Sequence, residues 1–195
     1  MSLGRVYLWH RAIPVSVFAV LLVGMYSLAL EENLLKNASF VEVDSKGYPN
    51  GWAGSYGGLK EGESKPSGFL KTVSGGKSGK REAQLHKPDS IDWVYAQQVI
   101  DLPLTAGEEY VFSVWMRSDG SVSVDLAFAA MPSEDGVKHQ WVRQRKDITD
   151  SWQQYQITLK VNADAEYIKL RCVLQLYTSD VALSIDDAAV VHKGN

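Results

Sequence analysis

The feature that most constrains the fold is an alternation of apolar and polar side chains with a period of two. In residues 109–118, EYVFSVWMRS, every second side chain is apolar: Tyr110, Phe112, Val114 and Met116. Successive side chains of a strand point to opposite faces of its sheet, so the segment is predicted to be a strand with one face in the core. The same pattern places Trp115 and Arg117 on the opposite face.

Other segments alternate in the same way, and glycine- and aspartate-rich turns separate them. They are residues 92–99, 121–131, 152–161, 167–177 and 181–191. Many short strands that each have one apolar face predict an all-β domain, folded as a two-sheet β-sandwich. The loop-rich region 53–81 gives no such pattern, and we expect irregular structure there.

The N-terminal segment 1–30 differs from the rest of the chain. A mildly basic start, with Arg5 and Arg11, precedes the uncharged apolar run 12–30. This order is typical of an export signal, and the run has about the length of a minimal membrane-spanning helix, roughly 20 residues. We expect a cleaved signal peptide or a retained N-terminal hydrophobic helix that anchors the chain. In both cases the domain 31–195 would be extracellular, periplasmic or at the cell surface.

The charge balance argues against a nucleic-acid partner. The chain has a formal net charge of -3. Without its first thirty residues it keeps 18 basic and 23 acidic side chains, a balance of -5. A nucleic-acid binder needs a basic surface to neutralise phosphates, so we expect no DNA or RNA partner.

The single cysteine, Cys172, allows no intramolecular disulfide. It lies in YIKLRCVLQLY (167–177), on the same face as Leu170 and Leu174. We therefore interpret it as a small core residue and not as a reactive thiol.

Aromatic and polar side chains on the outward strand faces are the candidate binding residues. Sugar rings present apolar C–H patches that lie on aromatic planes, and planar donors bond their hydroxyls. A second interpretation is that a loop covers such an indole, because Trp is usually mostly buried. Trp52 follows the Asn50-Gly51 turn, and we expect it to be structural. The candidate carbohydrate-binding residues, which we expect to form one platform, are Trp93, Tyr95, Gln97, Trp115, Arg117, Gln175 and Tyr177.

The sequence lacks the usual signs of an enzyme. Glycoside hydrolysis needs two carboxyl groups about 5 to 9.5 Å apart across a cleft, and Asp125 is the one acid that the pattern places on an outward face. Adjacent acids such as Asp186 and Asp187 point to opposite faces of an extended chain. The histidines are scattered and no H-E-x-x-H motif occurs. We expect no catalytic activity.

Five short motifs in order resemble the carbohydrate-binding modules of the CenC-like group. They are NLLKNASF, YPNGW, AQQVIDLPLTAGEEYVFSVWMRS, DSWQQYQITLKV and LSIDDAAVV, between residues 33 and 191. The resemblance implies a jelly roll of the galactose-binding-domain-like type. It also implies glycan binding without hydrolysis, on a concave sheet face that carries aromatic and polar side chains.

The resemblance also implies a structural calcium ion between the opening and closing strands, although no cofactor is required. Oxygen ligands suit calcium, and the positions that correspond are Glu42 and Asp187. Glu42 departs from the pattern, because Val41 follows Phe40 where the group has an acid. Asp187 could equally cap a turn or pair with a lysine.

These observations predict non-catalytic carbohydrate binding by an exported β-sandwich module, with a glycan as the partner. The membrane would be contacted only through residues 12–30, if they are retained. The alternative is a structural or adhesion domain of the cell envelope that uses the same fold to bind a protein partner. Modules of this group usually sit beside a catalytic domain. We expect none in this sequence, which gives the alternative more weight without replacing the main prediction.

Overall fold

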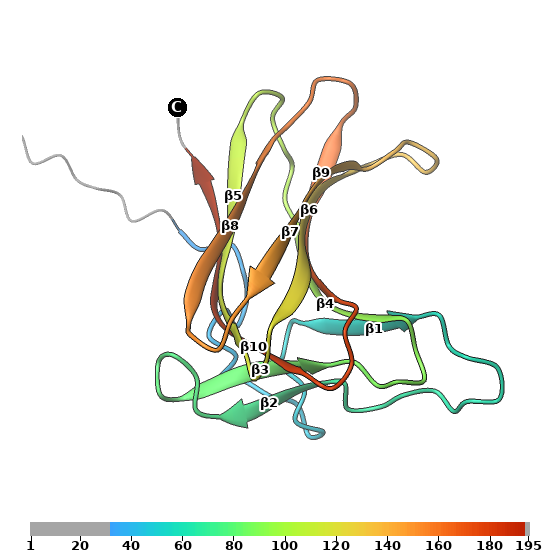
Figure 1. Cartoon of the computed structure of the whole chain (residues 1–195). Helices are drawn as coiled ribbons and strands as arrows, with labels where there is room; N and C mark the ends of the chain where they lie inside the picture. The colour runs from blue at the N-terminus through green and yellow to red at the C-terminus, as the bar shows by residue number, and fades with distance from the viewer. Residues whose placement is uncertain (1–31, 194–195) are drawn as a thin grey trace, which may run out of the picture. The chain divides into compact units, whose positions relative to one another are not determined.

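A computed structural model describes residues 32–193. Within them lie ten strands and no helix, so no helix of this part is long and apolar enough to cross a membrane (Figure 1). The expected N-terminal signal or anchor helix lies outside the described residues. The strands are β1 (Ala53–Gly57), β2 (Leu70–Ser74), β3 (Arg81–His86), β4 (Trp93–Asp101), β5 (Glu109–Ser118), β6 (Val122–Pro132), β7 (Gln140–Ile148), β8 (Gln153–Lys160), β9 (Tyr167–Leu176) and β10 (Ala182–Lys193).

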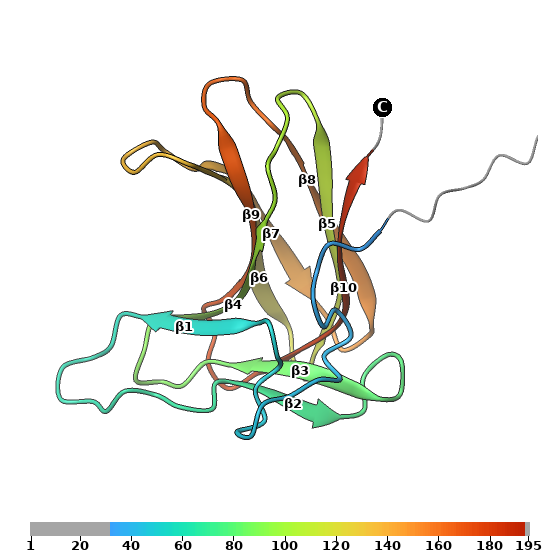
Figure 2. The same ribbon diagram turned by 180° about the vertical axis from the view of Figure 1, so that it is seen from behind.

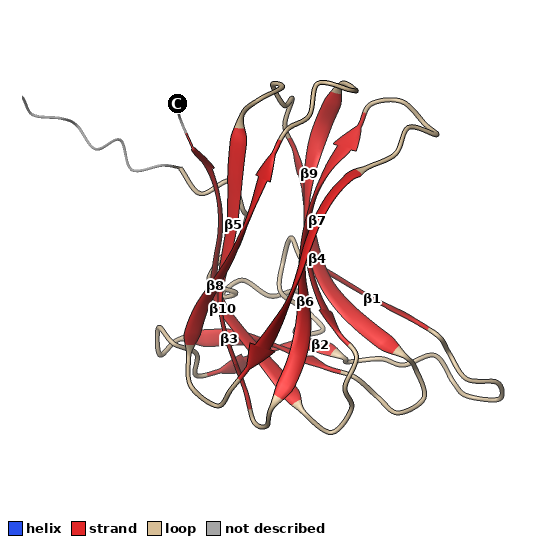
Figure 3. Cartoon of the chain, turned by 45° about the horizontal axis from the view of Figure 1, so that its top comes forward, coloured by secondary structure: helices blue, strands red, loops and turns tan. Residues whose placement is uncertain are grey.

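The strands form two five-stranded antiparallel sheets that face each other (Figures 1 and 3). The first sheet has the order β1-β4-β9-β6-β7, and the second sheet has the order β2-β3-β10-β5-β8. This confirms the predicted all-β sandwich of the jelly-roll type. Neighbours in each sheet are mostly distant in sequence, so the pairing depends on long-range contacts that strand periodicity does not encode.

The core lies between the inner faces of the two sheets. On β5, Phe112, Val114 and Met116 are fully buried, as the alternation predicts. The ring of Phe112 lies 5.9 Å from that of Phe128 on β6, across the two sheets. Burial of such side chains is the main stabilising term of a domain without disulfides.

Cys172 lies in this core, on β9, with no exposed surface. Burial raises the pKa of its thiol well above the ordinary value, because the thiolate would be poorly solvated there. The prediction of a core residue is confirmed.

The segment 32–52 runs beside β10 and closes one edge of the sandwich (Figure 2). The Asn33 side chain accepts a hydrogen bond from the backbone N–H of Val190 and donates one to the carbonyl of Ala188. Trp52 is buried, with its ring 5.0 Å from that of Phe40. The structural role predicted for Trp52 is confirmed.

Three parts of the chain differ from the sequence analysis, and one of them is β3, which lies between β2 and β10 although no strand was predicted there. The region 53–81, expected to be irregular, contains β1 and β2, which are short edge strands of the two sheets. Residues 140–148, for which no strand was predicted, form β7 at the other edge of the first sheet. Edge strands pack on fewer neighbours, so their sequences carry weaker apolar alternation.

Candidate functional site

The outer face of the first sheet gathers five of the predicted residues. Alternation along β4 turns Trp93, Tyr95 and Gln97 away from the core. Register pairing places Tyr95 directly beside Gln175 of β9, and Tyr177 follows at the end of the same strand. The register thus brings Tyr95, Gln97 and Gln175 onto one sheet face, and their binding of a glycan stays a prediction.

Trp93 and Tyr95 form a flat aromatic pair. Their ring centroids are 5.4 Å apart and their planes differ by only 11°. Gly57 of β1 lies opposite Trp93 in the register, and a Cβ at that position would come within 2.1 Å of the indole. The missing side chain of Gly57 therefore lets the indole lie across the neighbouring strand.

Arg171 of β9 lies beside this aromatic pair and is fixed from several sides. Its Nε donates to Gln97 Oε1 at 2.6 Å, and its Nη2 donates to the Tyr95 hydroxyl at 3.3 Å. The guanidinium carbon lies 5.6 Å from the ring centroids of both Tyr95 and Trp141. A cation at this distance from aromatic rings is attracted by their electron-rich faces.

Asp125 of β6 links three other side chains of the same outer face, those of Tyr177, Arg145 and Arg143. Its carboxylate accepts hydrogen bonds from the Tyr177 hydroxyl and from Arg145 Nε, both at 3.0 Å. Arg143 Nη1 lies 3.7 Å away. Asp125 raises the pKa of Arg145 by hydrogen bonding and charge. Burial, followed by the bond to Asp125, raises the pKa of Tyr177.

The side chains that β7 contributes were missed by the sequence analysis. Trp141, Arg143 and Arg145 occupy alternate positions and face outward, paired in register with Ala129, Ala127 and Asp125. Their two-residue spacing was the signal available in the sequence. On the opposite face Val142 and Ile148 are apolar, but Gln144 and Lys146 between them are polar, so no continuous apolar face marked the segment as a strand.

Trp115 and Arg117 belong to the second sheet, so the prediction that they share a surface with Trp93 is wrong. Alternation correctly turned both away from the core, but it does not tell which sheet a strand joins. Lys77 Nζ lies 4.1 Å from the centroid of the Trp115 ring. Arg117 pairs with Glu82 at 3.3 Å, and its guanidinium carbon lies 4.9 Å from the Trp152 ring centroid.

Of the two expected calcium ligands, Asp187 has a partner for its carboxylate, and Glu42 is bonded through its backbone. The Asp187 carboxylate pairs with Lys77 at 3.3 Å, and the backbone carbonyl of Glu42 accepts a hydrogen bond from the Asn37 amide. Within the described residues, no cluster of three or more His, Cys, Asp or Glu side chains could hold a metal ion. Backbone carbonyls also bind calcium, so the calcium site stays a prediction.

Solved structures with the same fold include both binding modules and part of an enzyme. A galactotriose-bound module, TmCBM61, is 18% identical with a TM-score of 0.54, and the match covers 83% of this chain and 99% of that one. The CBM22-1 xylan-binding domain of Paenibacillus barcinonensis Xyn10C is 18% identical with a TM-score of 0.57, over 85% and 97% of the two chains. At this identity the likeness concerns the fold alone.

The enzymatically active domain of tailspike protein 4 from bacteriophage CBA120 is 11% identical, with a TM-score of 0.63. The match covers 83% of this chain but only 21% of the tailspike chain, so this chain spans about a fifth of that protein. No curated protein matches the chain by sequence. Residues 32–180 match the family model described as a carbohydrate binding domain. Because this match covers most of the chain, the protein belongs to that family of carbohydrate binding domains.

Proposed function

We propose that the outer face of the first sheet binds a glycan without cleaving it. The observation that carries the proposal is the flat Trp93–Tyr95 pair beside a guanidinium that Gln97 holds in place. Flat rings offer an apolar surface to the C–H face of a sugar, and fixed donors bond its hydroxyls. Because the groups are held by one another, little side-chain entropy is lost on binding.

A non-catalytic role is supported by the state of the carboxylate on this face. Asp125 accepts bonds from Tyr177 and Arg145 and lies near Arg143. This carboxylate is buried and its oxygens accept from these donors, so it offers no free carboxyl group to a bound sugar. Glycoside hydrolysis would need a second carboxyl group across a cleft, and the other acids on the outer strands of this face lie at its margins, such as Asp147, which accepts from Ser123.

We also propose that the protein works outside the cytoplasm. The support is the composition of residues 1–30, a basic start followed by an uncharged apolar run. The leader would be either cleaved or retained as an anchor, and only in the second case would the protein contact a membrane.

The test is a glycan array probed with the wild-type protein and with two variants. Trp93→Ala removes one ring of the pair, and we expect it to weaken binding by about 1–2 kcal/mol, a five- to thirtyfold loss of affinity. Trp115→Ala is the matched control on the second sheet, and it should leave affinity unchanged. Binding of no glycan by the folded wild-type protein would instead favour the adhesion domain with a protein partner.

A further inference from the structure

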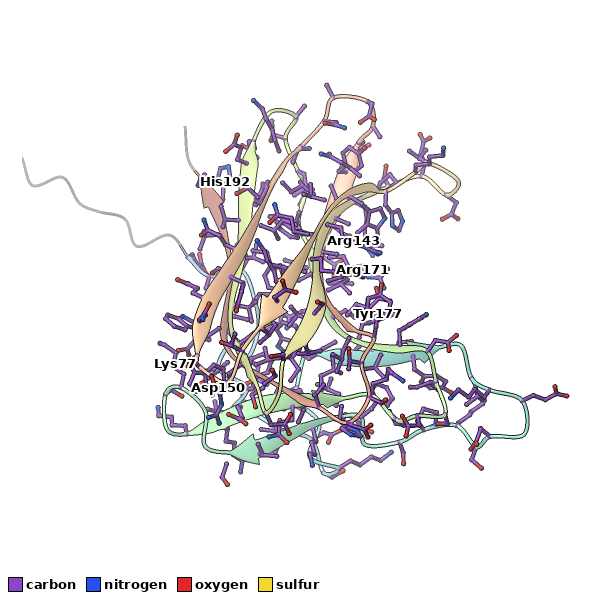
Figure 4. All side chains as sticks on the ribbon, in the orientation of Figure 1. Lys77, Arg143, Asp150, Arg171, Tyr177 and His192 are labelled. Carbon is purple, nitrogen blue, oxygen red and sulfur yellow. The ribbon has the colours of Figure 1, made fainter. Side chains whose placement is uncertain are left out.

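The outer face of the first sheet carries positive charge although the domain as a whole is acidic. Three guanidinium groups lie on it, those of Arg143, Arg145 and Arg171. Figure 4 labels Arg143 and Arg171. They contrast with a balance of -5 for residues 31–195. The local excess of cations is therefore not a consequence of overall composition.

The carboxylates near this face already have bonding partners. Arg145 pairs with Asp125 at 3.0 Å, and Lys169 of β9 pairs with Asp101 at 3.3 Å. Asp147, at the end of β7, accepts a hydrogen bond from Ser123. Among residues 32–193, Arg171 forms no ion pair, and its bonded partners are a neutral amide and a neutral hydroxyl.

The position of Arg171 fits an anion better than a neutral hydroxyl. Its guanidinium has five N–H donors, and the two bonds to Gln97 and Tyr95 leave donors free. The planar fork of an arginine matches a carboxylate or a sulfate through two parallel bonds. Rings on both sides, Tyr95 and Trp141, limit its movement and its hydration.

Arg143 supplies a second cation near the first. It lies two residues from Trp141 on β7, and Trp141 is in the same register row as Arg171, with Ala129 between them. The guanidinium of Arg143 is half exposed and 3.7 Å from a carboxylate that Arg145 already holds. Both arginines are thus on one face, within reach of a single oligosaccharide.

We propose that the glycan bound on this face is anionic, with a uronic-acid carboxylate or a sulfate ester held by Arg171 and steered by Arg143. The inference rests on the proposed function, since it names the chemical class of the ligand of the same face. The aromatic pair would hold the neighbouring sugar ring, so that charge and stacking select the ligand together.

The experiment compares matched acidic and neutral probes with the full-length protein. Trigalacturonate is paired with its carboxyl-reduced form, and a sulfated galactan is paired with its desulfated form. We expect at least about tenfold tighter binding of one acidic probe than of its partner, the range of one hydrogen bond to a charged group. The preference should shrink as salt is raised, and the pair that shows it tells carboxylate from sulfate.

Arg171→Gln should bring the ratio of acidic to neutral affinity close to one. Arg81→Gln is the control, because it removes one cation from β3 of the second sheet and gives the same net charge. An unchanged ratio in Arg171→Gln, or tighter binding of the neutral probes by the wild type, would overturn this inference and leave glycan binding intact. Binding of neither class by the folded protein would overturn the proposed function as well.

Discussion

Replacing Gly57 by alanine should weaken glycan binding, although the new methyl group itself would not touch the ligand. The new Cβ would lie 2.1 Å from a carbon of the Trp93 indole. Ordinary contact begins near 3.4 Å, so the ring must move by about 1.3 Å. Because Trp93 is only half-buried, it can swing outward and leave the stack with Tyr95.

The expected loss of affinity follows from that displacement. Losing one aromatic contact at the centre of an interface costs about 1–2 kcal/mol, a five- to thirtyfold weaker binding. The free energy of unfolding should change by less than about 1 kcal/mol. Relative to glycine, alanine stabilises a strand by roughly 0.5–1 kcal/mol, because it loses less backbone entropy on folding. This gain offsets the strain of moving the partly exposed ring of Trp93.

Gly54→Ala is the matched control on the same strand. Its Cβ would point to the core and come within 2.7 Å of the buried Phe69 ring. Overpacking of this kind costs about 1–3 kcal/mol of stability, while affinity should stay unchanged. Affinity is measured by titration calorimetry with the tightest glycan of the array, and stability by urea unfolding. Equal affinity of wild type and Gly57→Ala would refute the role of the aromatic pair.

Three further predictions concern stability. Burial and the hydrogen bond to Glu108 raise the pKa of Tyr110 to about 12. The unfolded chain therefore loses this proton first, and the free energy of unfolding should fall between about pH 10 and 12. In urea unfolding Tyr110→Phe should show a shallower fall with pH, and an equal slope would contradict the assignment. If calcium binds at Asp187, a chelator should lower the melting temperature of the wild type but not of Asp187→Ala. Identical melting curves of the wild type with and without chelator would refute the calcium site. A fragment that begins at Glu31 should unfold in one cooperative calorimetric transition, whereas a molten fragment would show that the sandwich needs the preceding residues.

The alternation of side chains was sufficient to predict the faces of the central strands. Trp93 and Tyr95 were correctly turned outward, and Phe112 was correctly turned inward, because the core selects apolar residues at every second position. Trp52 was also identified from its place behind a turn. These features depend on local sequence, which is why they could be read without the structure.

The grouping of strands into sheets could not be read in the same way. The strand of Trp115 pairs with β10 and β8, and that of Trp93 pairs with β1 and β9, although both have the same period. Strand partners are chosen by packing over long sequence separations. Trp141 and Arg143 were missed because Gln144 and Lys146 interrupt the apolar positions on the inner face of their edge strand.

The measurement that tests the central claim most directly is a nuclear magnetic resonance titration with the tightest glycan of the array. The indole N–H signals of the tryptophans report separately on the two sheets. We expect the signals of Trp93 and Trp141 to shift on binding, while those of Trp115 and Trp152 stay in place. Shifts at Trp115 and Trp152, with those of the first sheet unmoved, would place the glycan on the second sheet and contradict the account.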